Sequence, residues 1–178
     1  GVKMELQDII SADKEYVAST YARFNVAFKS GSGAKLYDFD GKEYIDCATG
    51  IGVNIFGVND EEWKNAVKAQ LDKIQHVSNL YYSQPQAELA KLLCQKTGAS
   101  KVFFSNSGAE ANECAIKIAR KYSFDKYGEG RNGIITLKNS FHGRTVTTLS
   151  ATGQDVFHNY FFPFTEGFSY VEAGDMNA

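Results

Sequence analysis

The most constraining feature of the sequence is an alternation of strand and helix patterns in its second half. Lys101–Phe104 is short, apolar and rich in β-prone residues, and Gly133–Leu137 repeats that pattern. Between them, the sequence predicts a helix from Gly108 to Tyr122. Its apolar face is expected to carry Ala111, Ala115, Ile118 and Tyr122. The order strand, helix, strand is typical of a parallel sheet covered by helices, so we predict an α/β fold.

The first half of the chain contains a hairpin pattern. In Leu36–Ile45, aromatic and branched residues flank Asp40-Gly41, a pair that favours the positive φ angles of a tight turn. A glycine-rich passage, Thr49–Gly57, follows the predicted hairpin.

Two helices are expected between the hairpin and the strand patterns. Asn59–Glu62 supplies a cap and an acidic first turn for one of them. Its apolar stripe consists of Trp63, Val67, Leu71 and Ile74. The other helix is predicted over Gln86–Thr97, with Gly98 as its stop signal. Its inward residues are expected to be Leu89, Leu92 and Leu93.

Composition argues against several classes of function. The net charge of -2 and four scattered arginines give no electrostatic basis for binding nucleic acid. No apolar run approaches the roughly 20 residues that span a bilayer. Cys47, Cys94 and Cys114 lie too far apart for a disulfide framework or a metal site. We therefore expect no metal, buried free thiols and a cytoplasmic location.

A candidate binding site begins at Ser107-Gly-Ala-Glu110. Ser107 can cap the predicted helix and Glu110 can reach back to it, which makes a capping box. Gly108 would let a ligand approach the bare amides of the first turn, whose positive dipole end suits a phosphate. The alternative is a well-capped helix that binds nothing.

A second candidate site is the loop Phe141-His-Gly-Arg144. Phe141 could stack on a flat heterocycle, and Arg144 could bind a carboxylate through its planar guanidinium. The alternatives are an aromatic ring folded into the core and a surface ion pair. His142 is more often structural than an acid–base group. Residues 105–108 and 139–144 both follow predicted strands, and ligands bind beyond the carboxyl ends of parallel strands.

These motifs together resemble the class III aminotransferases, which depend on pyridoxal phosphate. The resemblance rests on Val102–Glu113 and Asn139–Thr145, and it extends upstream through Leu36–Asp46, Gly50–Asn54 and His76–Leu80. Several motifs in the family's order make it far more specific than any single motif.

The resemblance implies the fold type I architecture of pyridoxal-phosphate-dependent transferases. Residues 1–57 would be a segment of the small domain with its hairpin. Residues 58–178 would be the first part of the large, mostly parallel α/β domain. Because family members are much longer, and Asp175–Ala178 looks like a helix cap and first turn, we expect the chain to be a fragment.

The resemblance also assigns roles to residues. Ser107, Gly108 and Ala109 would hold the cofactor phosphate, and Phe141 would stack on the pyridine ring. Arg144 would bind the substrate carboxylate with help from Tyr21, and Arg23 would be an outside candidate for the substrate's other end. No catalytic residue is expected in this chain, because the lysine that forms a Schiff base with the cofactor lies beyond residue 178 in the family.

Within the class, Gly50 and Ile51 and the wording of the two site motifs favour the branch that acts on N-acetylornithine with 2-oxoglutarate, a reaction of arginine biosynthesis. A glycine at 50 would leave room for an acylated substrate, where ornithine-specific members carry an aromatic residue. The alternatives are an ornithine, succinylornithine or 4-aminobutyrate aminotransferase, or a non-catalytic binding or assembly fragment. The resemblance further implies a homodimer and small-molecule partners.

Overall fold

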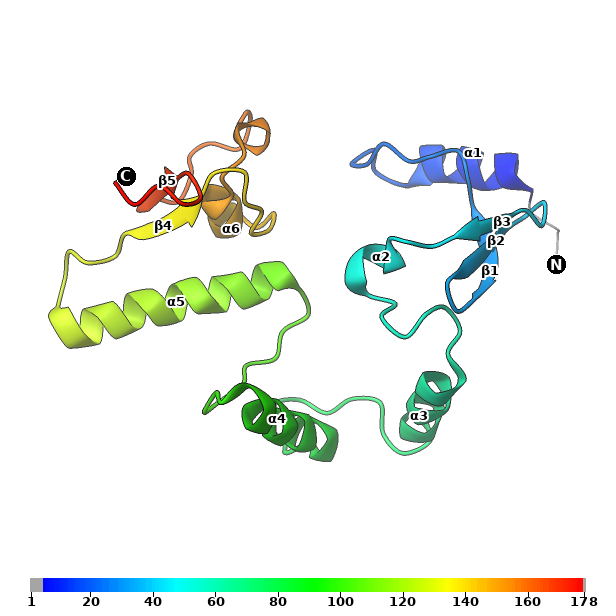
Figure 1. Cartoon of the computed structure of the whole chain (residues 1–178), viewed down its shortest axis with the longest axis horizontal. Helices are drawn as coiled ribbons and strands as arrows, with labels where there is room; N and C mark the ends of the chain where they lie inside the picture. Colours follow the sequence, from blue (N-terminus) through cyan, green and yellow to red (C-terminus); the bar gives the residue numbers. More distant parts are fainter. Residues whose placement is uncertain (1–4, 178) are drawn as a thin grey trace. The chain divides into compact units, whose positions relative to one another are not determined.

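A computed structural model describes residues 5–177 of the chain (Figure 1). The chain divides into two compact units, Gly1–Tyr82 and Ser83–Ala178, and each is described by itself. The predicted domain boundary between residues 57 and 58 concerns the domains of a longer protein, and it stays a prediction.

The first unit is built on a three-stranded antiparallel sheet of β1 (Phe28–Ser32), β2 (Lys35–Asp38) and β3 (Glu43–Ile45). The predicted hairpin is confirmed as β2–β3. The turn is longer than the predicted two-residue turn, since the last paired residues are Tyr37 and Glu43. Of Asp40 and Gly41, only Gly41 has a positive φ, 82°. The carboxylate of Asp38 organises this turn by accepting hydrogen bonds from the amides of Asp40 and Lys42, at 3.0 and 2.9 Å.

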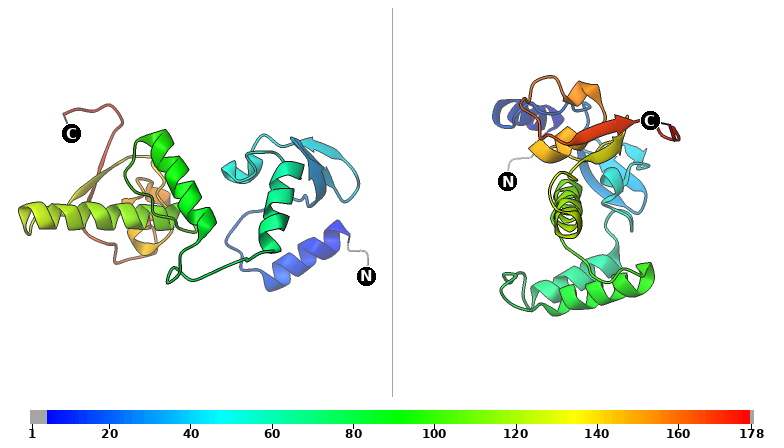
Figure 2. Two further views of the ribbon diagram at one scale, coloured as in Figure 1. Left: turned by 90° about the horizontal axis from the view of Figure 1, so that it is seen from below. Right: turned by 90° about the vertical axis from the view of Figure 1, so that its left-hand side faces the viewer.

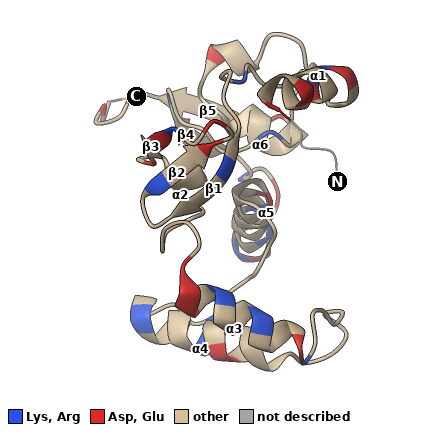
Figure 3. Ribbon diagram, turned by 90° about the vertical axis from the view of Figure 1, so that its right-hand side faces the viewer, with Lys and Arg blue, Asp and Glu red and all other residues tan. Residues whose placement is uncertain are grey.

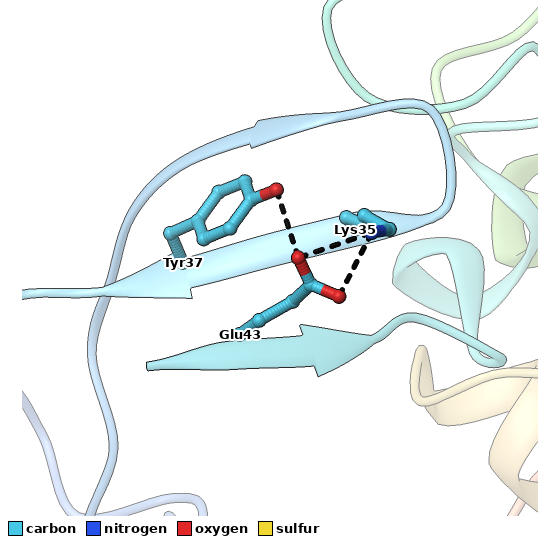
Figure 4. Close-up of polar contacts among 3 residues, drawn as sticks. All are labelled: Lys35, Tyr37 and Glu43. Atoms are coloured by element: carbon cyan, nitrogen blue, oxygen red, sulfur yellow. Dashed lines mark hydrogen bonds and ion pairs between the residues drawn. The ribbon is translucent and has the colours of Figure 1, made fainter. Parts of the chain in front are cut away.

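Three side chains form a polar network on one face of this hairpin (Figure 4). Tyr37 lies directly opposite Glu43 in the β2–β3 register. The Tyr37 hydroxyl donates to Glu43 Oε2 at 3.1 Å, and Lys35 Nζ lies 2.9 Å from Glu43 Oε1. Hydrogen bonds from Lys35 and then Tyr37 hold the pKa of Glu43 below its ordinary value. Cross-strand pairing of this kind stabilises the register of the hairpin.

The helices of the first unit are α1 (Leu6–Tyr16), α2 (Thr49–Gly52) and α3 (Glu61–Leu71). The predicted cap of α3 is confirmed, because Asp60 Oδ1 accepts the amide of Trp63 at 2.7 Å. The glycine-rich passage begins with α2, a left-handed turn in which Gly50 has φ 61° and Ile51 has φ 59°. Positive φ is rare for a β-branched residue, so this turn holds a strained backbone conformation.

The second unit contains α4 (Gln84–Thr97), α5 (Gly108–Tyr127), β4 (Ile134–Leu137), α6 (Val146–Ala151), the 3-10 turn η1 (Asp155–Phe157) and β5 (Phe168–Val171). Strands β4 and β5 pair in parallel, which confirms the predicted α/β class. In Figures 1 and 2, β4, β5 and α6 lie on the same side of α5. The αL conformation of Gly98 at the end of α4 confirms the predicted stop signal.

The core of the second unit lies around α6. Leu149 and Ala151 are buried there, together with Ile116 of α5. Three polar residues of the same segment are also buried, namely Thr148, Ser150 and Thr152. A segment that the sequence did not single out therefore supplies most of the buried side chains of this unit.

Several predicted inward faces are wrong. On α5, Ile118 and Tyr122 are 62% and 59% exposed, and the face that packs is that of Ile116. On α4, Leu89 and Leu92 are about half exposed. Helical spacing identifies apolar residues that share a face, but it does not show that the chain contains an element to cover that face.

The predicted strand Lys101–Phe104 is also wrong, since this segment is irregular. A β-strand needs a hydrogen-bonded neighbour, and within residues 5–177 neither sheet extends to this segment. At the other end of the unit, Asp175 Oδ1 accepts the amide of Asn177 at 2.9 Å. This is a cap-like contact, but Ala178 lies outside the described residues, so the predicted first turn is not tested.

The surface carries both signs of charge, interspersed along α3 and α4 (Figure 3). The three cysteines are free as predicted, but Cys47 is exposed and Cys94 and Cys114 are only partly covered, so the prediction of buried thiols is wrong. Across residues 5–177, no helix combines the length and the apolar character required to cross a bilayer.

Candidate active site

The first turn of α5 forms one wall of the candidate site. Ser107 is its N-cap, and Ser107 Oγ accepts the amide of Glu110 at 3.2 Å. The predicted capping box is only half right: Glu110 Oε2 accepts the amide of Asn106 at 2.6 Å, and not that of Ser107. Within the described part of the chain, no hydrogen bond uses the amides of Gly108 and Ala109. They are the free donors that a helix N-terminus offers an anion.

The loop between β4 and α6 forms the other wall. It begins at Asn139, which has φ 62°, and ends at Thr145, the N-cap of α6. Phe141 is 54% exposed, and its ring meets that of Phe157 edge-on, with centroids 5.8 Å apart. The ring is therefore held at its edge, and the alternative of a ring folded into the core does not occur.

The two walls enclose one hollow of about 500 Å³. It is lined by Ser107, Gly108, Ala109, Asn112, Phe141, His142, Gly143, Arg144 and Thr145. The residues predicted from the second half of the chain thus lie together at one site. Within the part of the chain that the structure describes, no lysine lines this hollow.

Gly143 lies close against the first turn of α5 and against Thr148. A Cβ atom built on it would lie 2.6 Å from Thr148 Oγ1 and 2.7 Å from the Cβ of Ala109. Its φ of 134° is also one that other residues rarely adopt. Only glycine lets the loop lie this close to the first turn of α5.

Gly108 faces open space. A Cβ built at this position meets nothing within 4 Å, so the fold itself does not require glycine here. The unused amides next to it and the empty space in front of it fit a bulky anion such as a phosphate.

Two residues that sequence reasoning missed also line the hollow, Asn112 and Thr145. Asn112 lies one helical turn after Gly108, so the spacing of α5 could have indicated that it shares a face with the first turn. Thr145 is a Ser/Thr residue just before an apolar helix, which is an ordinary cap signal.

His142 lines the candidate site and also a second hollow, and its predicted structural role stays a prediction. Its Nε2 atom is buried and has no hydrogen-bond partner within residues 5–177. His142 lines this second hollow, of about 290 Å³, together with Thr136. The Oγ1 atom of Thr136 is likewise buried without a hydrogen-bond partner among the described residues.

The other predicted substrate residues belong to the first unit. Tyr21 and Arg23 line a hollow with residues of α1, and Arg23 Nη1 forms an ion pair with Asp13 Oδ1 at 3.1 Å. Their predicted roles remain predictions.

Comparison with known proteins points to one family. The family model for class III aminotransferases matches residues 16–178. The acetylornithine aminotransferase of Haemophilus ducreyi is 56% identical over 175 residues, which cover 98% of this chain and 44% of that protein.

Two solved structures have the same fold. The ornithine aminotransferase of Toxoplasma gondii matches with a TM-score of 0.89 and 28% identity, over 94% of this chain and 40% of that one. The taurine:2-oxoglutarate aminotransferase of Bifidobacterium kashiwanohense, in complex with PLP and glutamate, matches with a TM-score of 0.84 and 28% identity, over 97% and 39%. The chain therefore spans less than half the length of the relatives that it matches.

Proposed function

Because this chain belongs to the class III aminotransferase family, we propose that the full-length protein is a pyridoxal-phosphate-dependent aminotransferase that uses N-acetylornithine and 2-oxoglutarate. The observation that carries this proposal is the single hollow lined by the Ser107–Ala109 turn and by Phe141 and Arg144. A phosphate, a flat ring and a carboxylate each find a matching group there.

The residues of this chain would bind and orient the cofactor and the substrate. The unused amides at Gly108 and Ala109, with the Ser107 cap, would hold the cofactor phosphate at the positive end of α5. Phe141 would pack on the pyridine ring, and Arg144, with Tyr21, would bind the substrate carboxylate. When bound, pyridoxal phosphate supplies the electron sink that transamination requires.

The group that moves the proton is not expected in this chain. Among residues 5–177, no lysine lines the hollow, and the family's Schiff-base lysine is expected in the part of the protein after residue 178. The isolated 178-residue chain would then bind without turnover, which is the second candidate function. Borohydride treatment of this chain with pyridoxal phosphate tests it: stoichiometric labelling of one lysine would contradict the absence of the essential lysine.

The choice of N-acetylornithine rests on relatives and on Gly50. An acetylornithine aminotransferase is 56% identical to this chain, and Gly50 places no side chain on the left-handed turn α2. Arginine biosynthesis is the pathway in which such an enzyme would act. Ornithine, succinylornithine and 4-aminobutyrate are the alternative donors.

We further propose that the full-length protein is a homodimer in the cytoplasm. Four apolar side chains in α2 and just after it are mostly exposed in this chain, namely Ile51, Val53, Ile55 and Phe56. Exposed apolar patches of this kind mark association surfaces. The three free cysteines are consistent with a reducing compartment.

The test is to assay the full-length protein with pyridoxal phosphate and 2-oxoglutarate against the four candidate donors. The expected result is the highest kcat/KM for N-acetylornithine. A higher kcat/KM for ornithine or 4-aminobutyrate would overturn the choice of donor. No transamination with any of them would overturn the proposed activity.

A further inference from the structure

Two adjacent polar residues of α5 reach across to the Phe141 loop. Asn112 Nδ2 donates to the main-chain carbonyl of His142 at 2.8 Å. Thr145 Oγ1 donates to Glu113 Oε1 at 2.5 Å. Both bonds are partly buried, and each joins residues at least 30 positions apart in sequence. They therefore fix the position of the loop relative to the helix, and not local structure within either one.

The opposite side of the loop is held by α6. The amide of His142 donates to Thr152 Oγ1 at 3.1 Å, and Thr145 and Thr148 form a reciprocal capping box. Thr148 and Thr152 are fully buried, so this side is rigid. The placement of loop and α6 together against α5 depends on the Gly143 contact and on the two bonds from α5.

The two bonds have distinct targets at the site. Asn112 holds the carbonyl of His142, the residue that follows Phe141. Asn112 itself lies on α5, one turn after the unused amides of Gly108 and Ala109. Glu113 holds Thr145, which follows Arg144 directly. The distance from the phosphate-binding amides to the stacking ring, and to the carboxylate-binding guanidinium, is thus set from one helix.

We infer that Asn112 and Glu113 are positioning residues, which hold Phe141 and Arg144 in register with the cofactor-binding turn of α5. The inference rests on the proposed function, because it assigns the ring and the phosphate to these two walls. Glu113 is not among the residues that line the hollow, and Asn112 lines it with its Nδ2 atom bonded to the His142 carbonyl. A displacement of about 1 Å in a reacting group can cost on the order of 100-fold in rate, so loss of either bond affects turnover more than it affects folding.

The test uses the full-length holoenzyme and four variants. Asn112→Asp keeps the shape but places an acceptor against the His142 carbonyl. Glu113→Ala removes the acceptor of the Thr145 hydroxyl, and Glu113→Gln keeps a carbonyl oxygen there. Asp125→Ala, which removes an exposed carboxylate elsewhere on α5, is the matched control.

The readouts are kcat and KM for the amino donor, the visible circular dichroism of the bound cofactor, and the affinity of the apoenzyme for inorganic phosphate. Asn112→Asp and Glu113→Ala are expected to lower kcat about tenfold or more and to weaken the cofactor's dichroism. In Glu113→Ala, phosphate affinity should stay within about threefold of wild type, because the amides of α5 are unchanged. Asn112→Asp is expected to bind phosphate more weakly, because it adds a negative charge among the residues that line the hollow. Glu113→Gln and Asp125→Ala should resemble wild type.

If Asn112→Asp and Glu113→Ala keep wild-type kcat and cofactor dichroism, the positioning inference is overturned while the proposed function stands. A wild-type protein that binds no pyridoxal phosphate would overturn the proposed function, and the inference with it. If Asn112→Asp does not fold, the two Glu113 variants test the inference. A positioning role would be refuted if Glu113→Gln did not restore the kcat and dichroism that Glu113→Ala loses.

Discussion

The close approach at Gly143 predicts a large effect for a single methyl group. In Gly143→Ala, the new Cβ would meet Thr148 Oγ1 at 2.6 Å, the Cβ of Ala109 at 2.7 Å and its Cα at 3.0 Å. Overpacking of this kind costs about 1–3 kcal/mol. The φ of 134° adds backbone strain of about 1–3 kcal/mol for a residue with a side chain. Gly143→Ala should therefore lower the free energy of unfolding by roughly 2–6 kcal/mol, unless the loop moves away from α5.

A double-mutant cycle with Ala109→Gly separates the two costs. Removing the Ala109 Cβ relieves one of the three contacts, but it leaves Thr148, the Cα of residue 109 and the backbone strain. The double variant should thus be about 1–2 kcal/mol more stable than the sum of the two single effects predicts, a coupling energy typical of residues in contact. Urea unfolding of the full-length protein and its three variants, with cofactor titration of each, measures this. Additive effects, or a Gly143→Ala variant with wild-type unfolding and cofactor affinity, would refute the close packing of loop and helix.

Three further substitutions in the full-length protein give separable results. Gly108→Ala should keep or raise stability, by up to about 1 kcal/mol, because its Cβ meets nothing within 4 Å; it should weaken cofactor affinity in the same titration, and unchanged affinity would count against a ligand close to this turn. Gly50→Tyr should reduce kcat/KM for N-acetylornithine more than for ornithine, and an equal reduction for both would contradict the role given to Gly50. Glu43→Gln should make the free energy of unfolding fall less steeply as the pH is lowered. Because the pKa of Glu43 is lowered in the folded protein, its ionised carboxylate stabilises the fold above the ordinary pKa of 4.5, and this stabilisation is lost as the pH falls through the lowered pKa. The effect should be small and salt-sensitive because the group is exposed, and urea midpoints from pH 7 to pH 3 that ran parallel for wild type and variant would contradict it.

Local signals in the sequence predicted the elements that local interactions determine. Asp60, Gly98 and Ser107 mark helix ends because each satisfies or terminates the backbone hydrogen bonds of its own helix. The strand and helix order predicted a parallel sheet, but not its strands: β4 pairs in parallel with β5, which the sequence analysis did not identify, and Lys101–Phe104 is irregular. The Ser107–Glu110 turn and the Phe141–Arg144 loop were singled out because each has a short, self-contained sequence pattern.

Features that depend on distant partners were not predictable in the same way. Lys101–Phe104 has the composition of a strand, but strand formation depends on a neighbour that no local pattern specifies. The inward face of α5 was misplaced because the buried residue Ile116 shares its surroundings with residues distant in the sequence, such as Ala151 and Phe168. The contacts of Asn112 and Glu113 were missed for the same reason, since their partners lie across the loop at His142 and Thr145.

The buried segment of α6 has a consequence for how this protein can vary. Its most enclosed side chains are hydroxyls, and they serve as acceptors for amides outside the helix: Ser150 Oγ accepts the amide of Thr165 at 2.9 Å, and Thr152 Oγ1 that of His142. Replacing such a threonine by valine preserves its volume and raises its hydrophobicity, yet it strands a buried N–H group. Natural variants should therefore exchange serine and threonine here and avoid aliphatic residues, in a region where hydropathy alone would favour the opposite.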